Sequence, residues 1–142
     1  MNVICFLPDF VLNNKYGNDY SRLHCDFISE TCLTFDADLY VIGDIDCGFS
    51  GQNVRAKNLF TTSKKPVFIQ DLNEVPGEKV MLEKTGEPIQ NVDLSEIKTI
   101  IIGPDDRDFK NQYKKVTINT PKDYPLWSGV AAGIVLHTIQ NK

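Results

Sequence analysis

Six short apolar runs, each bounded by proline, glycine or polar residues, are spread along the chain. This pattern predicts buried strands at residues 2–7, 38–43, 66–70, 79–83, 99–103 and 115–118. The fourth run is expected to end in a turn at Thr85 and Gly86. In the fifth run, Ile100, Ile101 and Ile102 follow one another, which suits a strand that is buried on both faces of a parallel sheet.

Helical patterns separate several of these runs. Apolar residues recur three and four positions apart from Tyr20 to Ile28, and Asn18 or Asp19 can cap such a helix. Residues 53–60 are a second, short helix candidate. A third helix is predicted from Pro125, which suits a first turn, to about residue 139. On one side of it lie Leu126, Val130, Ile134, Val135 and Ile139.

Strands and helices thus alternate from end to end, without a linker, a repeat or a low-complexity segment. This order is typical of a single α/β domain with a mostly parallel sheet and helices on both faces. The 142 residues are too few for two full cores, so residues 1–142 are expected to form one domain. In such sheets ligands bind beyond the carboxyl ends of the strands, where the loops gather.

The composition, 42% hydrophobic and 24% charged residues, falls in the range of soluble globular proteins. No apolar stretch approaches the roughly 18 residues that a membrane span needs. The N-terminus has no basic region and reaches Pro8 and Asp9 at once, which argues against a signal peptide. The protein is therefore expected to be cytoplasmic and not associated with a membrane.

The chain has four cysteines, Cys5, Cys25, Cys32 and Cys47, and no two of them have Cys-x-x-Cys spacing. Neither histidine completes a set of zinc ligands, so no metal is expected. In a protein without a signal peptide, the cysteines are expected to be reduced and mostly buried.

Charge is distributed unevenly along the chain. Residues 1–50 carry two basic and eight acidic residues, net −6, whereas residues 51–142 carry thirteen and eleven, net +2. Nucleic-acid-binding domains are commonly more basic than this. Composition alone therefore argues mildly against RNA as a partner, although basic residues cluster near Arg55 and Lys57.

Three segments could carry chemistry. After the fifth strand, Gly103 lets the backbone approach a ligand and Pro104 stiffens the chain, but a strand-to-helix turn explains them equally well. Trp127 opens a helix rich in glycine and alanine, where it could stack on a base or simply pack. Arg22 could reach the site above the sheet, or form a weak surface pair with Asp26 four residues on.

The order of these segments resembles the SPOUT, or trefoil-knot, RNA methyltransferases, and most closely their tRNA/rRNA ribose 2′-O-methyltransferase branch. The resemblance rests on FLPDFVLNNKYGNDYSR near the N-terminus, then on IIIGPDDRDF, VTINTP and YPLWSGVAAGIVLH. It implies a C-terminal trefoil knot, S-adenosylmethionine as cofactor, an RNA substrate, either tRNA or rRNA, and a homodimer whose site is completed across the interface.

The resemblance also assigns roles to particular residues. Arg22 matches the arginine that acts on the ribose hydroxyl, and Asn14 in the same first motif is the other catalytic candidate. The substrate candidates are Arg55, Lys57 and Trp127. The candidate cofactor-binding residues are Gly103, Pro104, Asp105, Ile118, Leu126, Trp127, Ser128 and Val130.

Two alternatives remain open. One is a catalytically lapsed SPOUT-fold homodimer that binds the cofactor or RNA as an interaction module, because Pro125, Leu126 and Trp127 stand where the family has Ser-Leu-Asn. The other is an unrelated α/β domain that binds a phosphate or a nucleotide. That class would need a glycine-rich loop after the first strand, and PDFVLNNKYG is a poor one.

Overall fold

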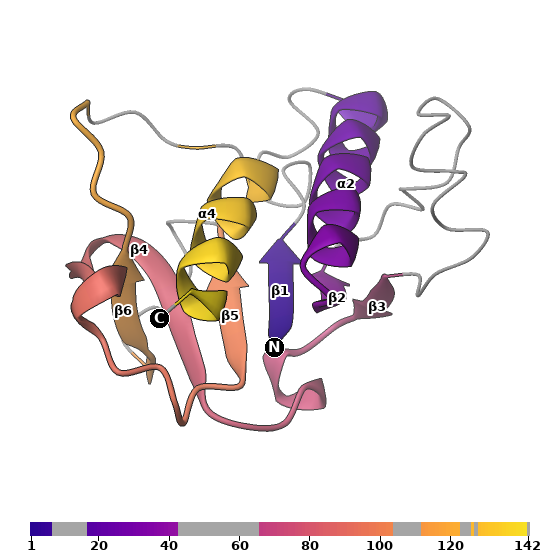
Figure 1. The fold of residues 1–142 in the computed structure, drawn as a ribbon. Coiled ribbons are helices and arrows are strands. Elements are labelled where there is room, and N and C mark those ends of the chain that lie inside the picture. The colour runs from indigo at the N-terminus through magenta and orange to yellow at the C-terminus, as the bar shows by residue number, and fades with distance from the viewer. Residues whose placement is uncertain (7–16, 43–65, 104–111, 123–125, 127, 142) are drawn as a thin grey trace.

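In the computed structural model, six strands form one parallel sheet in the order β3-β2-β1-β5-β4-β6 (Figure 1). The structure describes residues 1–6, 17–42, 66–103, 112–122, 126 and 128–141, without the side chains of residues 17–23. The elements are β1 (Asn2–Phe6), α2 (Gly17–Thr34), β2 (Asp38–Ile42), β3 (Val67–Ile69), η1 (Leu72–Glu74), β4 (Lys79–Pro88), η2 (Ile89–Asn91), β5 (Thr99–Ile102), β6 (Lys114–Thr117) and α4 (Ser128–Gln140).

All six predicted strands are present, and the two-sided burial of the fifth is confirmed. Ile100 and Ile102 belong to the cluster on one face of the sheet, whereas Ile101 belongs to the cluster on the other face. None of the three side chains is more than 3% exposed. The parallel α/β architecture expected from the sequence is therefore confirmed.

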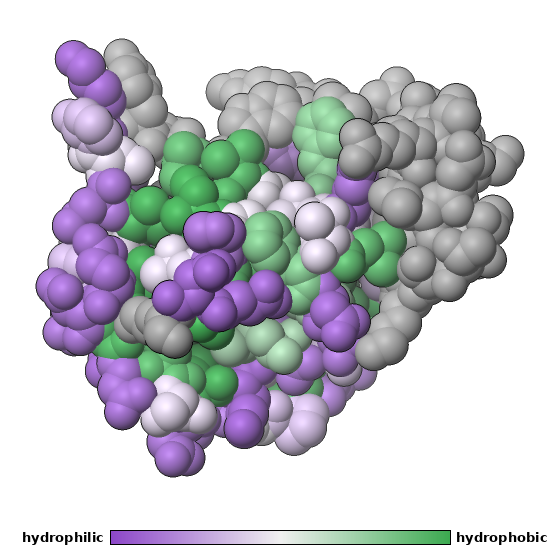
Figure 2. Space-filling view, viewed as in Figure 1, coloured by the Kyte–Doolittle hydropathy of each residue, from purple (hydrophilic) through white to green (hydrophobic). Residues whose placement is uncertain are grey.

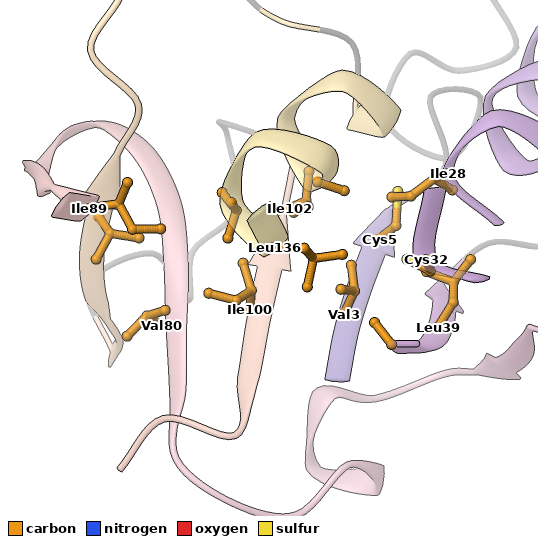
Figure 3. Packing of buried hydrophobic residues seen from close by; sticks show 14 of the residues in the cluster. Val3, Cys5, Ile28, Cys32, Leu39, Val80, Ile89, Ile100, Ile102 and Leu136 are labelled. Carbon is orange, nitrogen blue, oxygen red and sulfur yellow. The ribbon is translucent and has the colours of Figure 1, made fainter. Parts of the chain in front are cut away.

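The helices α2 and α4 lie side by side on one face of the sheet (Figure 1). Their apolar side chains, among them Ile28 and Leu136, pack on Val3, Cys5 and their neighbours in the sheet (Figure 3). On the opposite face, the strands bury a second cluster together with the segment around η1. The helix predicted at 53–60 lies outside the described residues.

The turn expected at Thr85 and Gly86 is wrong, because β4 continues through both residues to Pro88. Val116 of β6 faces Leu82 before an irregularity in the pairing and Glu87 after it. A Cβ atom on Gly86 would lie 2.6 Å from backbone atoms of β6, so this glycine permits a close approach of two strands. We call residues 83–86 the β4 bulge.

The outward face of the last helix also differs from the prediction. The predicted stripe of Leu126, Val130 and Ile134 is 39%, 53% and 38% exposed. Val135 and Ile139 of the predicted side do face the core, but the other residues that α4 buries are Ala131, Ala132 and Leu136. Small side chains let a helix approach its neighbours closely, and this explains why the alanine-bearing face is turned inward. The helix begins at Ser128, three residues later than predicted.

Hydrogen bonds fix the carboxyl-terminal ends of α2 and α4. Asp36, which follows α2, has a φ of 53°, and the Ala37 amide donates to the Cys32 carbonyl at 2.8 Å, which closes the last turn. The Gln140 side chain at the end of α4 donates to the Phe35 carbonyl at 2.7 Å. The two helices are thus joined at the amino-terminal edge of the sheet.

Among the described residues, no helix has the length and apolarity needed to cross a bilayer. The trefoil knot implied by the family resemblance stays a prediction, because residues 104–111 and 123–125 lie outside the described part of the chain.

Candidate functional site

Three adjacent strands, β5, β4 and β6, bring several candidate residues to one edge of the sheet. In a parallel sheet all carboxyl ends meet at the same edge, where ligands bind. Gly103 follows β5, Ile118 follows β6, and the β4 bulge lies between these two strands. The helix α4 begins on the same side, above the ends of β1 and β5 (Figure 1). We call this region the strand-end site.

Gly103 has a backbone conformation that favours glycine. Its φ is +62°, in the left-handed region that other L-residues rarely adopt. No atom of the described residues lies within 4 Å of the position that a Cβ would take. Gly103 thus combines a tight turn with open space beside it. Pro104 and Asp105, the next two candidates, lie outside the described residues.

Ile118 is half-buried and packs against the core cluster under α2 and α4. Its side chain is therefore used for packing. The backbone of Ile118 directly follows β6, at the carboxyl edge of the sheet.

Ser128, another cofactor candidate, is half-buried and is the first residue of α4. Cys5 is 1% exposed and donates to the Phe6 carbonyl with a sulfur–oxygen distance of 3.6 Å. Burial raises the pKa of this thiol to about 12, and the Ser128 hydroxyl acts in the opposite direction. The Cys5 thiol is therefore protonated at neutral pH.

Val130 faces outward, into an apolar groove between α2 and α4. The groove has a volume of about 640 Å³ and is lined by His24, Phe27, Glu30, Thr31, Thr34, Gly129 and Val130. Figure 2 looks onto this side of the molecule and shows hydrophobic surface gathered over the two helices. Burial lowers the pKa of His24, so the groove carries a neutral imidazole at pH 7. We call it the α2–α4 groove.

Arg22 lies in the second turn of α2. Its side chain is not described, and Asn14, Arg55, Lys57 and Trp127 lie outside the described residues altogether. The prediction of a surface pair between Arg22 and Asp26 is wrong in one respect. Asp26 does not lie at the surface, because its side chain is only 2% exposed. Burial, followed by the charge of Glu30, raises the pKa of Asp26. Among the described residues, its Oδ1 atom has no hydrogen-bond partner.

Sequence reasoning missed one feature of this region, the β4 bulge. The Thr-Gly pair that signalled a turn was the available sign of the bulge, but such a pair does not distinguish a turn from a close approach of strands.

Within the described residues, no group of three or more histidine, cysteine or acidic side chains is placed to hold a metal ion. Cys5, Cys25 and Cys32 are free thiols in the structure, and all three are buried, as predicted. Cys47 lies outside the described residues.

The fold was compared with known proteins. No family model and no curated protein matches the chain. Among solved structures, the SpoU methyltransferase AviRb from Streptomyces viridochromogenes, in complex with AdoMet, superposes with a TM-score of 0.72 and 16% identity. That match covers 99% of this chain and 57% of AviRb.

Two further solved structures match over 99% of this chain. One, described as giving insights into the 2-OH methylation of C/U34 on tRNA, has a TM-score of 0.67 and 15% identity, with 97% of that chain covered. The other is the A. aeolicus TrmH/SpoU tRNA modifying enzyme, with a TM-score of 0.67 and 14% identity, and the match covers 73% of that enzyme's chain.

The chain therefore has the fold of the SpoU/TrmH RNA methyltransferases, as the family resemblance predicted. It spans a little over half of AviRb but nearly the whole length of the tRNA-methylating protein.

Proposed function

We propose that this protein is an S-adenosylmethionine-dependent RNA methyltransferase that transfers a methyl group to a ribose 2′-hydroxyl of tRNA or rRNA, in the cytoplasm. The observation that carries the proposal is the match of the fold over 99% of the chain to a SpoU methyltransferase in complex with AdoMet. The glycine turn at the carboxyl edge of the sheet supports it.

The residues of the strand-end site fit this cofactor. The left-handed turn at Gly103 leaves open space at the carboxyl edge of the sheet, and backbone groups exposed there can hydrogen-bond an adenine or a ribose. Gly103, Pro104, Asp105, Ile118 and Leu126 are the residues that would hold it. When bound, S-adenosylmethionine supplies a methyl group that is activated by the positive sulfonium.

In the proposed reaction, the protein holds the ribose oxygen in line with that methyl group. A hydroxyl is a weak nucleophile at neutral pH, and an arginine is always protonated. The role of Arg22 is therefore to orient the hydroxyl and to stabilise the negative charge that develops on its oxygen. Asn14, in the same first motif, is the second catalytic candidate, and Arg55, Lys57 and Trp127 are the candidates for contact with the RNA.

Titration calorimetry with S-adenosylmethionine and, separately, with S-adenosylhomocysteine tests the proposal directly. We expect each to bind at one site per protomer with an affinity in the micromolar range, about −8 kcal/mol. Absence of binding by both compounds would contradict the cofactor assignment and with it the proposed activity.

We further propose that the protein is a homodimer that closes the α2–α4 groove. Val130 lines this groove and Ile134, one turn further along α4, is also exposed, so a two-fold axis can pack these two side chains of each copy against the groove of the other. Val130→Asp is expected to convert the dimer to a monomer in analytical ultracentrifugation. Val67→Asp, at an equally exposed valine on β3, serves as the control and should stay dimeric. A monomeric wild type would contradict the assignment.

One observation favours the lapsed-module alternative, namely that Pro125, Leu126 and Trp127 stand where the family has Ser-Leu-Asn. Under this alternative, the purified protein binds the cofactor but transfers no methyl group to unmodified tRNA or rRNA.

A further inference from the structure

We propose that lysines along β6 and the β4 bulge bind the phosphate backbone of the substrate RNA beside the strand-end site. We call these residues the β6 stripe, which consists of Lys84, Lys114, Lys115 and Lys122. The inference rests on the proposed function for its ligand, RNA. It concerns a surface separate from the substrate candidates Arg55, Lys57 and Trp127.

The charge of this part of the chain is opposite to that of the remainder. Together, β4 and residues 112–122 carry five lysines and two glutamates, whereas all other residues carry ten basic and seventeen acidic side chains. Elsewhere in the described part of the chain, Arg22 and Lys98 are the only arginine or lysine residues. An acidic protein that binds RNA needs a locally positive surface, because neutralisation of phosphates supplies much of the affinity.

Strand pairing brings the stripe together along one edge of the sheet. Lys114 and Lys115 are the first two residues of β6, which ends the sheet next to β4. Lys84 lies in the β4 bulge, which interrupts the pairing of β4 with Val116. The bulge is held close to β6, because a Cβ on Gly86 would lie 2.6 Å from the backbone of Lys115 and Val116. Lys84 and Lys114 are exposed, and both therefore face solvent at the same edge.

The β6 stripe continues past the strand-end site. From Lys114 to the end of β6 the chain rises about 10 Å, at roughly 3.3 Å per residue, and Ile118 follows directly. Lys122 is exposed four residues further on, where the Thr120 hydroxyl donates to the Lys122 carbonyl at 2.6 Å and closes a turn. This segment extends beyond the end of β6 in Figure 1, and Figure 2 shows hydrophilic surface along the same side. Lysines thus lie before and after a candidate cofactor residue.

This arrangement suits a single strand of RNA. Methylation of a ribose requires an accessible nucleotide, and in RNA such nucleotides are found in loops and bulges. The flanking nucleotides carry phosphates on a continuous strand, which lysines bind through charge without reading the bases. The β6 stripe can therefore hold the strand that flanks the target nucleotide, whatever its base sequence.

The test is titration of fluorescently labelled bulk unmodified tRNA, without cofactor, at several salt concentrations from about 50 to 200 mM. The triple variant with Lys84, Lys114 and Lys122 changed to glutamine is expected to bind at least about tenfold more weakly at the lowest salt. The slope of log affinity against log salt should fall by about two to three, because three phosphate contacts are lost. Calorimetry should show an affinity for S-adenosylmethionine within about twofold of the wild type.

A matched pair of single variants tests the position of the stripe. Lys84→Gln is expected to reduce the salt slope by about one. Lys98→Gln removes an equally exposed lysine at the amino-terminal edge of the sheet, beside β5, and should leave both slope and affinity unchanged. Equal effects of these two variants would contradict a contact that is specific to the stripe.

Binding of tRNA without cofactor separates this proposal from the proposed function. If the triple variant loses tRNA binding but neither protein binds S-adenosylmethionine, the β6 stripe stands and the methyltransferase assignment fails. A wild type that binds no tRNA, or a triple variant with the wild-type affinity and salt slope, would overturn the proposal. Normal tRNA binding by a triple variant that self-associates in ultracentrifugation would also overturn it, because the lysines would then serve only to keep an edge strand from pairing with other sheets.

Discussion

Replacing Arg22 with alanine is expected to lower methyl transfer to RNA by at least about 100-fold, the usual cost of removing one charged group that stabilises a developing oxyanion. The affinity for S-adenosylmethionine should stay within about threefold of the wild type, because Arg22 lies on α2 and the cofactor candidates follow β5 and β6. Single-turnover transfer of a radiolabelled methyl group to bulk unmodified tRNA, with calorimetry in parallel, measures both quantities.

Two variants sharpen this experiment. Arg22→Lys keeps the charge but loses the planar fork of donors, so it should recover only part of the rate. Lys98→Ala removes an exposed positive charge at the amino-terminal edge of the sheet, next to β5, and should leave the rate unchanged. An Arg22→Ala protein that methylates RNA at the wild-type rate would rule out the catalytic role.

Replacing Gly103 with alanine is expected to weaken the binding of S-adenosylmethionine at least tenfold. A side chain at a φ of +62° costs about 1–2 kcal/mol, and relief of that strain moves the turn away from the site. The added methyl group also projects into the open space that the cofactor is proposed to fill. Calorimetry gives the affinity, and thermal unfolding gives the accompanying loss of stability.

Gly133→Ala is a control at a second glycine, where alanine is expected to raise the stability of the protein instead of lowering it. Gly133 lies inside α4, and an added Cβ would meet only the Thr31 methyl group at 3.5 Å, an ordinary contact. Alanine in a helix interior is more stable than glycine by about 0.5–1 kcal/mol. This variant should therefore unfold at a higher temperature and bind the cofactor normally. If Gly103→Ala also binds normally, the turn is not part of the cofactor site.

The strands could be predicted from sequence because the burial of each strand follows from a short run of apolar residues within that strand. Three adjacent isoleucines have no polar neighbour to point outward, and the structure buries Ile100 and Ile102 on one face and Ile101 on the other. Six such runs, alternating with helical patterns, are enough to define a parallel α/β sheet.

The β4 bulge and the orientation of α4 could not be predicted in the same way. Position 86 needs a glycine because the backbone of β6, about 30 residues further on in sequence, lies very close to it. That closeness depends on the tertiary pairing of β4 with β6, which no local pattern shows. In α4, both the isoleucine–valine side and the alanine side are apolar. Only the packing on α2 decides that Ala132 is buried and Val130 exposed.

The residues of the candidate site differ in the same way, because some follow from a local pattern and others depend on distant contacts. Gly103 follows a strong strand pattern, so its place at the edge of the sheet could be predicted and is confirmed. Ile118 was assigned through its place in a motif, and its side chain packs against the core cluster. A motif gives the order of residues along the chain, whereas the direction of a side chain depends on a partner that is distant in sequence.

The central position of β1 has a consequence for synthesis on the ribosome. The first strand to emerge pairs with β2 on one side, but its other neighbour is β5. At roughly 5–20 residues per second, the approximately 60 residues from the end of β2 to the end of β5 take about 3–12 s to make. During that interval the nascent chain presents an unpaired apolar edge at Val3, Ile4 and Cys5, and unpaired edges of this kind recruit other strands. Chaperone binding to the nascent chain is therefore expected to matter most before residue 102 has emerged.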